Sequence, residues 1–412
     1  MRAHFLLTVV ILIVIAVSLM STPTASSNAM APVRLGINRY VIESLINARA
    51  DQILADGMML LRDIDRPGDV SCTIELVRDG DVSTFSTGNG IIASQADFNA
   101  VCATGGRVHV VTKINYCGGV SSNFLGCADL PGKCIVVVRI TENLEGILWM
   151  HEYGHNQGLS HRVDPFAVMD PVIQIQHKSV NNFECTAYQL PPPPFFIKGK
   201  PQPGTMQRKP IDVETFVRQT FIHGVPYETA SRFPATVVPR LLRMLADPSE
   251  ERYWSNIIAT LGAIGDERAV APLIRFFTAD EGRISDTRYE AKTAVLLSLG
   301  YLINKNENSA SMSFLLSSLD PDAWPRRVKW TGRFPTDMED QRVYLTKMAI
   351  WGLALSGRPE ARDALLELKS PGRTEEARRT QERLGSVVDE ALALHARVAR
   401  FGLVETYRQF PY

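Results

Sequence analysis

The sequence of 412 residues lacks three features that would assign it to a common class of protein. It has no net charge, because 44 Lys and Arg balance 44 Asp and Glu, so nothing in its overall charge favours nucleic acid or an anionic membrane. Beyond the N-terminal segment it has no apolar run of the roughly 20 residues that span a bilayer. It has no Cys-x-x-Cys pair, which disfavours a zinc site built from thiolates. We therefore expect a soluble globular protein, long enough for two domains.

The first thirty residues have the pattern of an export signal. Arg2 precedes an apolar run from Phe5 to Met20, and small and polar residues follow up to Ala29. The run is too short to anchor the chain, so we expect residues 1–29 to be a cleaved signal peptide. The mature protein would then be secreted or periplasmic, with no further membrane association.

The six cysteines are confined to one part of the chain, from Cys72 to Cys185. An even number of cysteines within one segment of an exported protein predicts disulfides that stabilise a single domain. The sequence does not choose among the pairings. These cysteines are Cys72, Cys102, Cys117, Cys127, Cys134 and Cys185.

Residues 32–190 mix helical and strand patterns, which predicts an α+β domain. An amphipathic helix is expected over residues 41–62 and another from Thr141 or Asn143, either of which could cap it with a side-chain oxygen, to about Gln157. A further helix is expected after Ser179. Strands are expected in the runs CTIELV, RVHVVTKI and CIVVVRI, and the last is apolar enough to be a central strand.

A proline-rich stretch at residues 191–210 predicts a stiff linker, and beyond it the strand pattern gives way to paired helices. The pairs Leu261-Gly262 and Leu299-Gly300 recur at close to the period of a helical hairpin. The phrase LGAIGDERAVAPLI resembles HEAT repeats of the short bacterial type. We therefore expect residues 211–412 to form an all-α, HEAT-like solenoid, whose surface would recognise a protein substrate or partner.

The segment HEYGHNQGLSH, which begins at His151, has the pattern of a catalytic metal site. On a helix His151 and His155 lie one turn apart and face the same way, so both can bind one metal ion. Gly158 can end the helix and turn the chain, which brings in His161 as a third ligand. Three neutral imidazoles suit Zn²⁺ and leave its fourth position open for water, as in a catalytic site. Glu152 is placed to accept a proton from that water.

These residues resemble the metzincin clan of zinc metallopeptidases, whose motif HExxHxxGxxH precedes a methionine-containing turn. The turn corresponds to AVMDP, with Met169 as a structural floor beneath the metal, and the details are most similar to matrixins. The resemblance implies a zincin-type catalytic domain. It also implies that Gly126, Cys127 and Ala128 lie on the edge strand along which substrate binds. The chain departs from the clan in having no tyrosine two residues after the methionine.

The expected function is that of an exported zinc endopeptidase, in which Glu152 is the general base. Two alternatives stay open: a secreted HEAT-like binding scaffold with an inactive zincin domain, or a zinc amidase that acts on cell-wall peptides. Structural Ca²⁺ is also left open, with Asp129, Asp164 and Asp170 as candidates that lack the spacing of a known calcium loop.

Other conspicuous residues are expected to be structural. His109 and His177 are interpreted as core or surface histidines and not as ligands. Residues 320–340 interleave Trp324 and Trp330 with cationic residues, and packing against the helices is expected over a recognition role.

Overall fold

The computed structural model describes residues 31–64, 66–176, 179–191, 202–206, 210–333, 337–370 and 375–409. Residues 32–412 form one compact unit, which contains both an α+β region and a helical region. The expected signal peptide and residues 192–201 and 207–209 of the expected linker lie outside the described residues. The division of the unit at 191–210 therefore stays a prediction.

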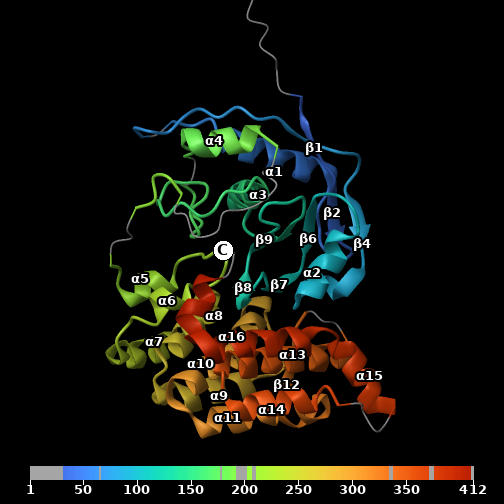
Figure 1. Ribbon diagram of the computed structural model, residues 1–412, viewed down its shortest axis with the longest axis vertical. Coiled ribbons are helices and arrows are strands. Elements are labelled where there is room, and N and C mark those ends of the chain that lie inside the picture. Colours follow the sequence, from blue (N-terminus) through green and yellow to red (C-terminus); the bar gives the residue numbers. More distant parts are fainter. Residues whose placement is uncertain are drawn as a thin grey trace, which may run out of the picture. The chain divides into compact units, whose positions relative to one another are not determined.

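A five-stranded sheet organises the α+β region (Figure 1). All its neighbouring strands are parallel except β9, which runs antiparallel to β10 and forms one edge. The expected strand CIVVVRI forms the interior strand β10, but β6 is central. In order across the sheet the strands are β4 (Ser83–Phe85), β2 (Ile37–Tyr40), β6 (Val108–Val111), β10 (Ile135–Val138) and β9 (Gly126–Ala128).

Two smaller sheets complete the strands of this region. The pair β1 (Val33–Leu35) and β3 (Leu76–Arg78) is parallel. The second sheet has the order β5 (Ile91–Ile92), β7 (Lys113–Tyr116) and β8 (Val120–Phe124).

The first helix is shorter than the apolar spacing predicted. It is α1 (Asn47–Leu60), and the strands β1 and β2 precede it. Ile42 and Ile46 fit the helical period, but they are 36% and 67% exposed and lie before the first residue of the helix. Their apolar spacing therefore does not mark a buried face, and the helix begins only after it.

The other helices of the α+β region are α2 (Gln95–Cys102), α3 (Glu142–Asn156) and α4 (Asn182–Gln189), with a 3-10 turn η1 (Thr87–Gly90). Thr141 is the N-cap residue of α3, but its side chain makes no capping hydrogen bond, contrary to expectation. The helix α3 packs side by side with α1 (Figure 1). Their contact is close because a Cβ atom on Gly146 would lie 2.9 Å from the backbone nitrogen of Gly57.

The predicted disulfides are confirmed, and all six cysteines are paired. The bonds are Cys72–Cys185, Cys102–Cys134 and Cys117–Cys127. Two of these bonds attach to the strands that border α3. Cys127 of the Cys117–Cys127 bond lies in β9, and Cys134 of the Cys102–Cys134 bond directly precedes β10.

The region after residue 210 is helical, as predicted, except for a short parallel pair, β11 (Glu281–Arg283) and β12 (Lys329–Thr331). Its helices are α5 (Val213–Val217), α6 (Tyr227–Ala230), α7 (Val238–Leu245), α8 (Trp254–Ile264), α9 (Val270–Thr278), α10 (Asp286–Asn306), α11 (Ser309–Leu316), α12 (Trp324–Arg327), α13 (Met338–Ser356), α14 (Pro359–Glu367), α15 (Glu375–Leu384) and α16 (Val387–Arg408). Short 3-10 turns are η2 (Ala235–Val237), η3 (Pro248–Tyr253), η4 (Glu267–Ala269) and η5 (Pro321–Ala323). Among the described helices, none has the length and apolar character needed to cross a membrane.

Small residues let α8, α10 and α13 pack closely, side by side (Figure 1). A Cβ atom on Gly262 would lie 2.6 Å from Ser298 Cβ, and one on Gly300 would lie 2.1 Å from the backbone oxygen of Gly352. The recurring Leu-Gly pairs therefore mark helix contacts. Trp324 and Trp330 are 1% and 0% exposed, so both pack into this core as expected.

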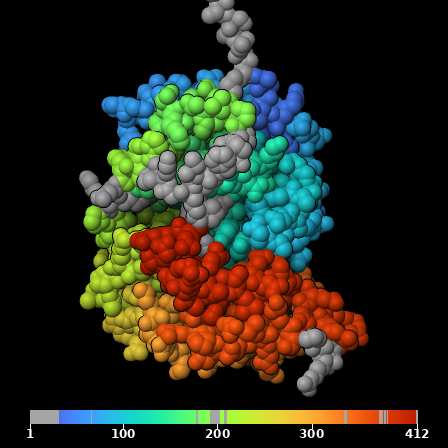
Figure 2. Space-filling model, viewed as in Figure 1, coloured from blue at the N-terminus to red at the C-terminus, as the bar shows by residue number. Residues whose placement is uncertain are grey.

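The helical and α+β regions share an apolar core. Ile91, Val120 and Val172 belong to the same buried cluster as the helices from α5 onward. Trp351 in α13 donates to the backbone oxygen of Ala93 at 2.9 Å. In Figure 2 the red C-terminal helices border the teal part of the α+β region. Tyr407 of α16 donates to the Val120 oxygen at 3.2 Å.

Candidate metal centre

The helix α3 holds two of the predicted ligands, His151 and His155, both 0% exposed. Backbone carbonyls fix their rings: Nδ1 of His151 lies 2.9 Å from the Val168 oxygen, and Nδ1 of His155 lies 2.8 Å from the Leu159 oxygen. A carbonyl only accepts, so each Nδ1 carries the proton and donates it. Each Nε2 atom then presents its lone pair to the inside of the site, as a metal-binding imidazole does.

The third predicted ligand, His161, arrives after the helix has ended. Gly158 has a φ of +82°, a left-handed conformation that favours glycine and turns the chain. The ring centroid of His161 then lies 5.2 Å from that of His151 and 5.0 Å from that of His155. The structure thus brings the three predicted histidines together.

A fourth histidine, His223, faces the same point, and sequence analysis missed it. It lies in the helical region, between α5 and α6, and its Nε2 atom is 3.3 Å from Nε2 of both His151 and His155. Its ring centroid is 5.0 Å from that of His161. No local spacing connects His223 to the motif, and its only sequence signal is a histidine in the short apolar phrase FIHG.

The four histidines fit zinc. Their nitrogen atoms lie within 4.8 Å of one another, and Nε2 of His151 and Nε2 of His155 are 3.1 Å apart. Four nitrogen atoms at about 2.0–2.1 Å from a tetrahedral zinc ion would be about 3.3–3.4 Å apart. The Nε2 atoms of His151, His155 and His223 are 3.1–3.3 Å apart, close to this value. Among the described residues, these four form the one group of three or more His, Cys, Asp or Glu side chains that could hold a metal ion.

The protonation preferences of the site also suit a cation. Burial lowers the pKa of His155 to about 4. Burial and the three neighbouring imidazoles hold the pKa of His223 well below its ordinary value. Both rings are therefore neutral near pH 7, which is the form that binds metal.

Glu152 lies beside the histidines and is 0% exposed. Its Oε1 atom is 3.7 Å from Nε2 of His223, and neither of its carboxylate oxygens has a hydrogen-bond partner among the described residues. Burial raises the pKa of this carboxyl well above its ordinary value. A carboxylate with increased proton affinity, next to a cation site, is suited to act as a general base.

Met169 lies directly beneath α3 and is 0% exposed. A Cβ atom on Gly154 would lie 2.4 Å from Met169 Sδ, so only glycine leaves room for this approach. Tyr188 donates to the backbone oxygen of Met150 at 2.9 Å and to Met169 Sδ at 3.4 Å. The methionine therefore supports the helix that carries two histidines.

The strand β9 contains Gly126, Cys127 and Ala128, which the resemblance assigned to substrate binding. It forms the edge of the five-stranded sheet and lies against Glu152, since a Cβ atom on Gly126 would be 2.2 Å from Glu152 Oε1. All three residues are buried. The structure thus brings this strand to the metal centre, but it does not leave its side chains open.

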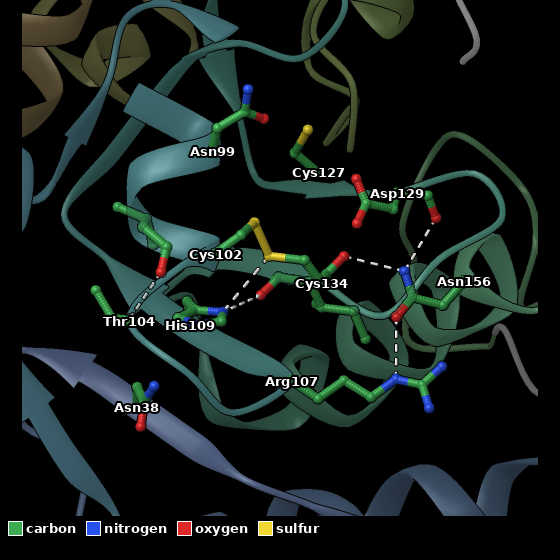
Figure 3. Close-up of a disulfide and its surroundings, with 12 residues drawn as sticks. Asn38, Asn99, Cys102, Thr104, Arg107, His109, Cys127, Asp129, Cys134 and Asn156 are labelled. Atoms are coloured by element: carbon green, nitrogen blue, oxygen red, sulfur yellow. Dashed lines mark hydrogen bonds between the residues drawn. A yellow bond between two sulfur atoms is a disulfide. The ribbon is translucent and has the colours of Figure 1, made fainter. Parts of the chain in front are cut away.

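Figure 3 shows how the end of α3 is fastened to the sheet. Asn156 donates to the backbone oxygens of Asp129 and Cys134, each at 3.0 Å, and accepts from Arg107 Nε at 3.1 Å. His109 lies nearby, but its ring nitrogens face the carbonyls of Gly105 and Ile135 at 2.9 and 3.3 Å. His109 is therefore a core histidine, as expected.

Among the residues that the structure describes, the remaining polar candidates do not converge on a second metal site. Arg162 donates to Asp164 at 2.8 Å, and Asp170 accepts from the backbone nitrogens of Asp164 and Val172, each at 2.8 Å. These contacts are structural, and the structure adds no support for Ca²⁺. His177 lies outside the described residues.

Comparison with protein families matches residues 255–278 to the PBS lyase HEAT-like repeat. These residues span α8 and α9, so the expected HEAT-like character is confirmed for this hairpin. Repeats of this kind commonly form protein-binding surfaces. Comparison with curated proteins finds no match. The metzincin resemblance therefore stays a prediction.

Proposed function

We propose that this protein is a zinc-dependent endopeptidase of metzincin type. The convergence of His151, His155 and His161 on one buried point beside Glu152 carries the proposal. The hydrogen bonds of Nδ1 in the first two histidines support it, because they aim Nε2 into the site. Met169 beneath α3 and the edge strand β9 agree with the arrangement that the resemblance implies.

Zinc, when bound, supplies Lewis acidity, which polarises a carbonyl and acidifies water. The chain's own residues supply the rest of the chemistry. Glu152 takes the proton of the attacking water and delivers it to the leaving nitrogen, for which its buried position and raised pKa suit it. The carbonyls of Val168 and Leu159 keep two imidazoles in orientation throughout.

The export and recognition parts of the hypothesis rest on the sequence. The mature protein would be secreted or periplasmic after cleavage of residues 1–29. Mass spectrometry of the purified protein would test this by showing at which residue its N-terminus lies. The helical region, with its HEAT-like repeat, would recognise a protein substrate or partner.

One observation favours a second candidate function, a secreted binding scaffold with an inactive zincin-like region. His223 would complete a closed set of four nitrogen ligands, and closed sets are typical of structural zinc sites. The zinc would then stabilise the junction of the two regions and have no catalytic role.

Zinc content and new peptide ends test the proposed function. Four proteins are compared: the wild type, Glu152→Gln, His223→Ala and the double variant with both substitutions. We expect about one zinc ion per chain in all four proteins, because Glu152 is not among the ligands. Incubation with a complex protein mixture should create new peptide ends, detected by mass spectrometry, and Glu152→Gln should remove them.

Undiminished cleavage by the Glu152→Gln proteins would contradict the role of Glu152. The absence of cleavage by every zinc-loaded protein would favour the scaffold. Cleavage of short cross-linked cell-wall peptides alone would favour the amidase alternative.

A further inference from the structure

The chain from Thr220 to His223 runs past the backbone that leads into β9. Leu125 donates its backbone N–H to the Ile222 oxygen at 2.8 Å, and Phe124 forms an antiparallel bridge with His223. An extended peptide that binds a sheet edge makes the same kind of backbone contact. The segment 220–223 therefore pairs with the two residues directly before the edge strand β9.

The opposite side of this segment contacts the chain that follows Met169. Ile173 donates its N–H to the Thr220 oxygen at 2.8 Å, and Ile222 donates its N–H to the Pro171 oxygen at 2.9 Å. Phe221 forms an antiparallel bridge with Val172. The segment is thus held from both sides by backbone hydrogen bonds, between the chain that follows Met169 and the chain that leads into β9.

The side chain at the end of the segment reaches the metal position itself. Nε2 of His223 lies 3.3 Å from the corresponding atoms of both helix histidines and 3.7 Å from Glu152 Oε1. A water molecule or a substrate carbonyl would need the same place, because a tetrahedral zinc ion with four nitrogen ligands has no vacant position. His223 therefore excludes both while it stays there.

Residues of the helical region hold the segment in place. Asn256, at the start of the HEAT-like hairpin, donates to the backbone oxygens of Val217 and Gln219 at 3.0 and 2.8 Å. Asn123 of β8 donates to Asn256 Oδ1 at 2.8 Å. One buried side chain thus links the HEAT-like hairpin, strand β8 and the chain just before Thr220.

We propose that residues 220–223 form an intramolecular plug, in which His223 is a fourth metal ligand that must leave before a peptide can be cleaved. The proposal rests on the proposed function for its consequence, but the metal coordination can be tested alone. The plug occupies the backbone that leads into the edge strand and the metal position together, since both contacts come from one short segment. The link through Asn256 means that a change in the helical region can release it.

Cobalt substitution tests the coordination without any assay of cleavage. The full-length protein, loaded with Co²⁺ in place of zinc, should show the visible absorption of a four-coordinate ion. Acetohydroxamate should alter this spectrum only weakly, because His223 fills the site. In His223→Ala we expect acetohydroxamate to bind about tenfold or more tightly, because the plug no longer competes. Free imidazole should restore the original spectrum of that variant.

Thr220→Ala is the matched control, because its side chain is exposed in the same segment and only its backbone oxygen makes a contact in the plug. It should bind acetohydroxamate as weakly as the intact protein. If His223→Ala does not fold, titration of the cobalt-loaded intact protein with acetohydroxamate still tests the plug, because an open site would bind acetohydroxamate readily. Tight binding by the intact protein would overturn the plug, whether or not the protein cleaves peptides.

Peptide cleavage separates this inference from the proposed function. An increase of about tenfold or more in His223→Ala supports both. If the variant binds acetohydroxamate more tightly but cleaves nothing, the plug stands and the proposed peptidase is wrong. If the intact protein cleaves as fast as His223→Ala, the peptidase stands and the plug is wrong.

Discussion

At the scale of single residues, Gly126 controls where Glu152 can lie. The two residues come from different elements, β9 and α3, and the absence of a side chain at Gly126 leaves the space that the carboxylate fills. Glu152 has no hydrogen-bond partner among the described residues that would hold it elsewhere. Its position therefore depends on packing, and Gly126 is a positioning residue for the base of the proposed peptidase.

We predict that Gly126→Ala lowers peptide cleavage by about 10–100-fold in the His223→Ala background, because the new methyl group would displace Glu152 Oε1 and a shift of about 1 Å in a reacting group has an effect of this size. Zinc content should not change, because the histidines are not displaced. Kinetic assays and metal analysis on the same samples check both parts.

Thr84→Ala is the control for this prediction, because Thr84 is exposed in β4 at the opposite edge of the sheet and the change adds no atom near Glu152. Equal activity of Gly126→Ala and its parent would show that the carboxylate finds another position at no cost. Loss of zinc from Gly126→Ala would show that the strand supports the ligands as well.

At the scale of elements, β7 joins the α+β region to the helices α10 and α13 through a buried lysine. Nζ of Lys113 donates to Thr293 Oγ1 at 3.3 Å and lies 5.6 and 6.0 Å from the ring centroids of Tyr289 and Tyr344. Burial lowers the pKa of Lys113 to about 8, although the negative charges of Glu290 and Asp286 oppose this shift. The contact is specific, but it stabilises the charged lysine less than water does.

Lys113→Met should change how stability depends on pH. Between pH 8 and 10.5 the unfolded chain keeps a proton that folded Lys113 has released, so the folded wild type gains stability as the pH rises through this range. A difference of about 2.5 in pKa corresponds to about 3 kcal/mol in the free energy of unfolding. The stability of the variant relative to wild type should therefore fall by about this amount from pH 8 to pH 10.5.

Urea denaturation at the two pH values measures this change. Lys305→Met, at an exposed position in α10, controls for the loss of one lysine from the chain. A stability difference between wild type and Lys113→Met that is the same at both pH values would contradict the buried, proton-releasing lysine.

At the scale of the whole molecule, the two regions depend on one another. Apolar residues of the α+β region, among them Ile91, Val120 and Val172, lie in the core that the helices build. Tyr344 of α13 donates to Asn115 of β7 at 2.6 Å, in a buried contact. The fourth histidine of the metal centre also comes from the helical region. Removing the helices would expose apolar surface and open the centre at the same time.

A chain of residues 32–210 should therefore fail to fold cooperatively. The exposed part of the shared core would have no partner, and burial of apolar surface is the main favourable contribution to folding. Near-ultraviolet circular dichroism and calorimetry, with residues 32–412 as the reference, check this. A sharp calorimetric transition in the short chain would instead support the division at 191–210 that the proline-rich stretch predicts.

The sequence by itself determined the parts of this protein that local spacing encodes. Helical periodicity places His151 and His155 on one face of α3, and Gly158 marks the turn that brings in His161. The same periodicity identified the paired helices, one pair of which matches a HEAT-like repeat. The confinement of the cysteines predicted that they pair. Each of these predictions depends on residues that are close in sequence or of the same type.

The tertiary structure alone decided that His223 joins the three histidines of the motif and that residues 220–223 lie beside them. His223 is distant in sequence from the motif, and its approach depends on backbone pairing of residues 220–223 with two other segments. The place of Gly126 against Glu152 likewise depends on the sheet order. The spacing of residues along the chain does not predict such contacts. Backbone hydrogen bonds form between residues of any type, and the packing of distant elements sets the distance between their side chains.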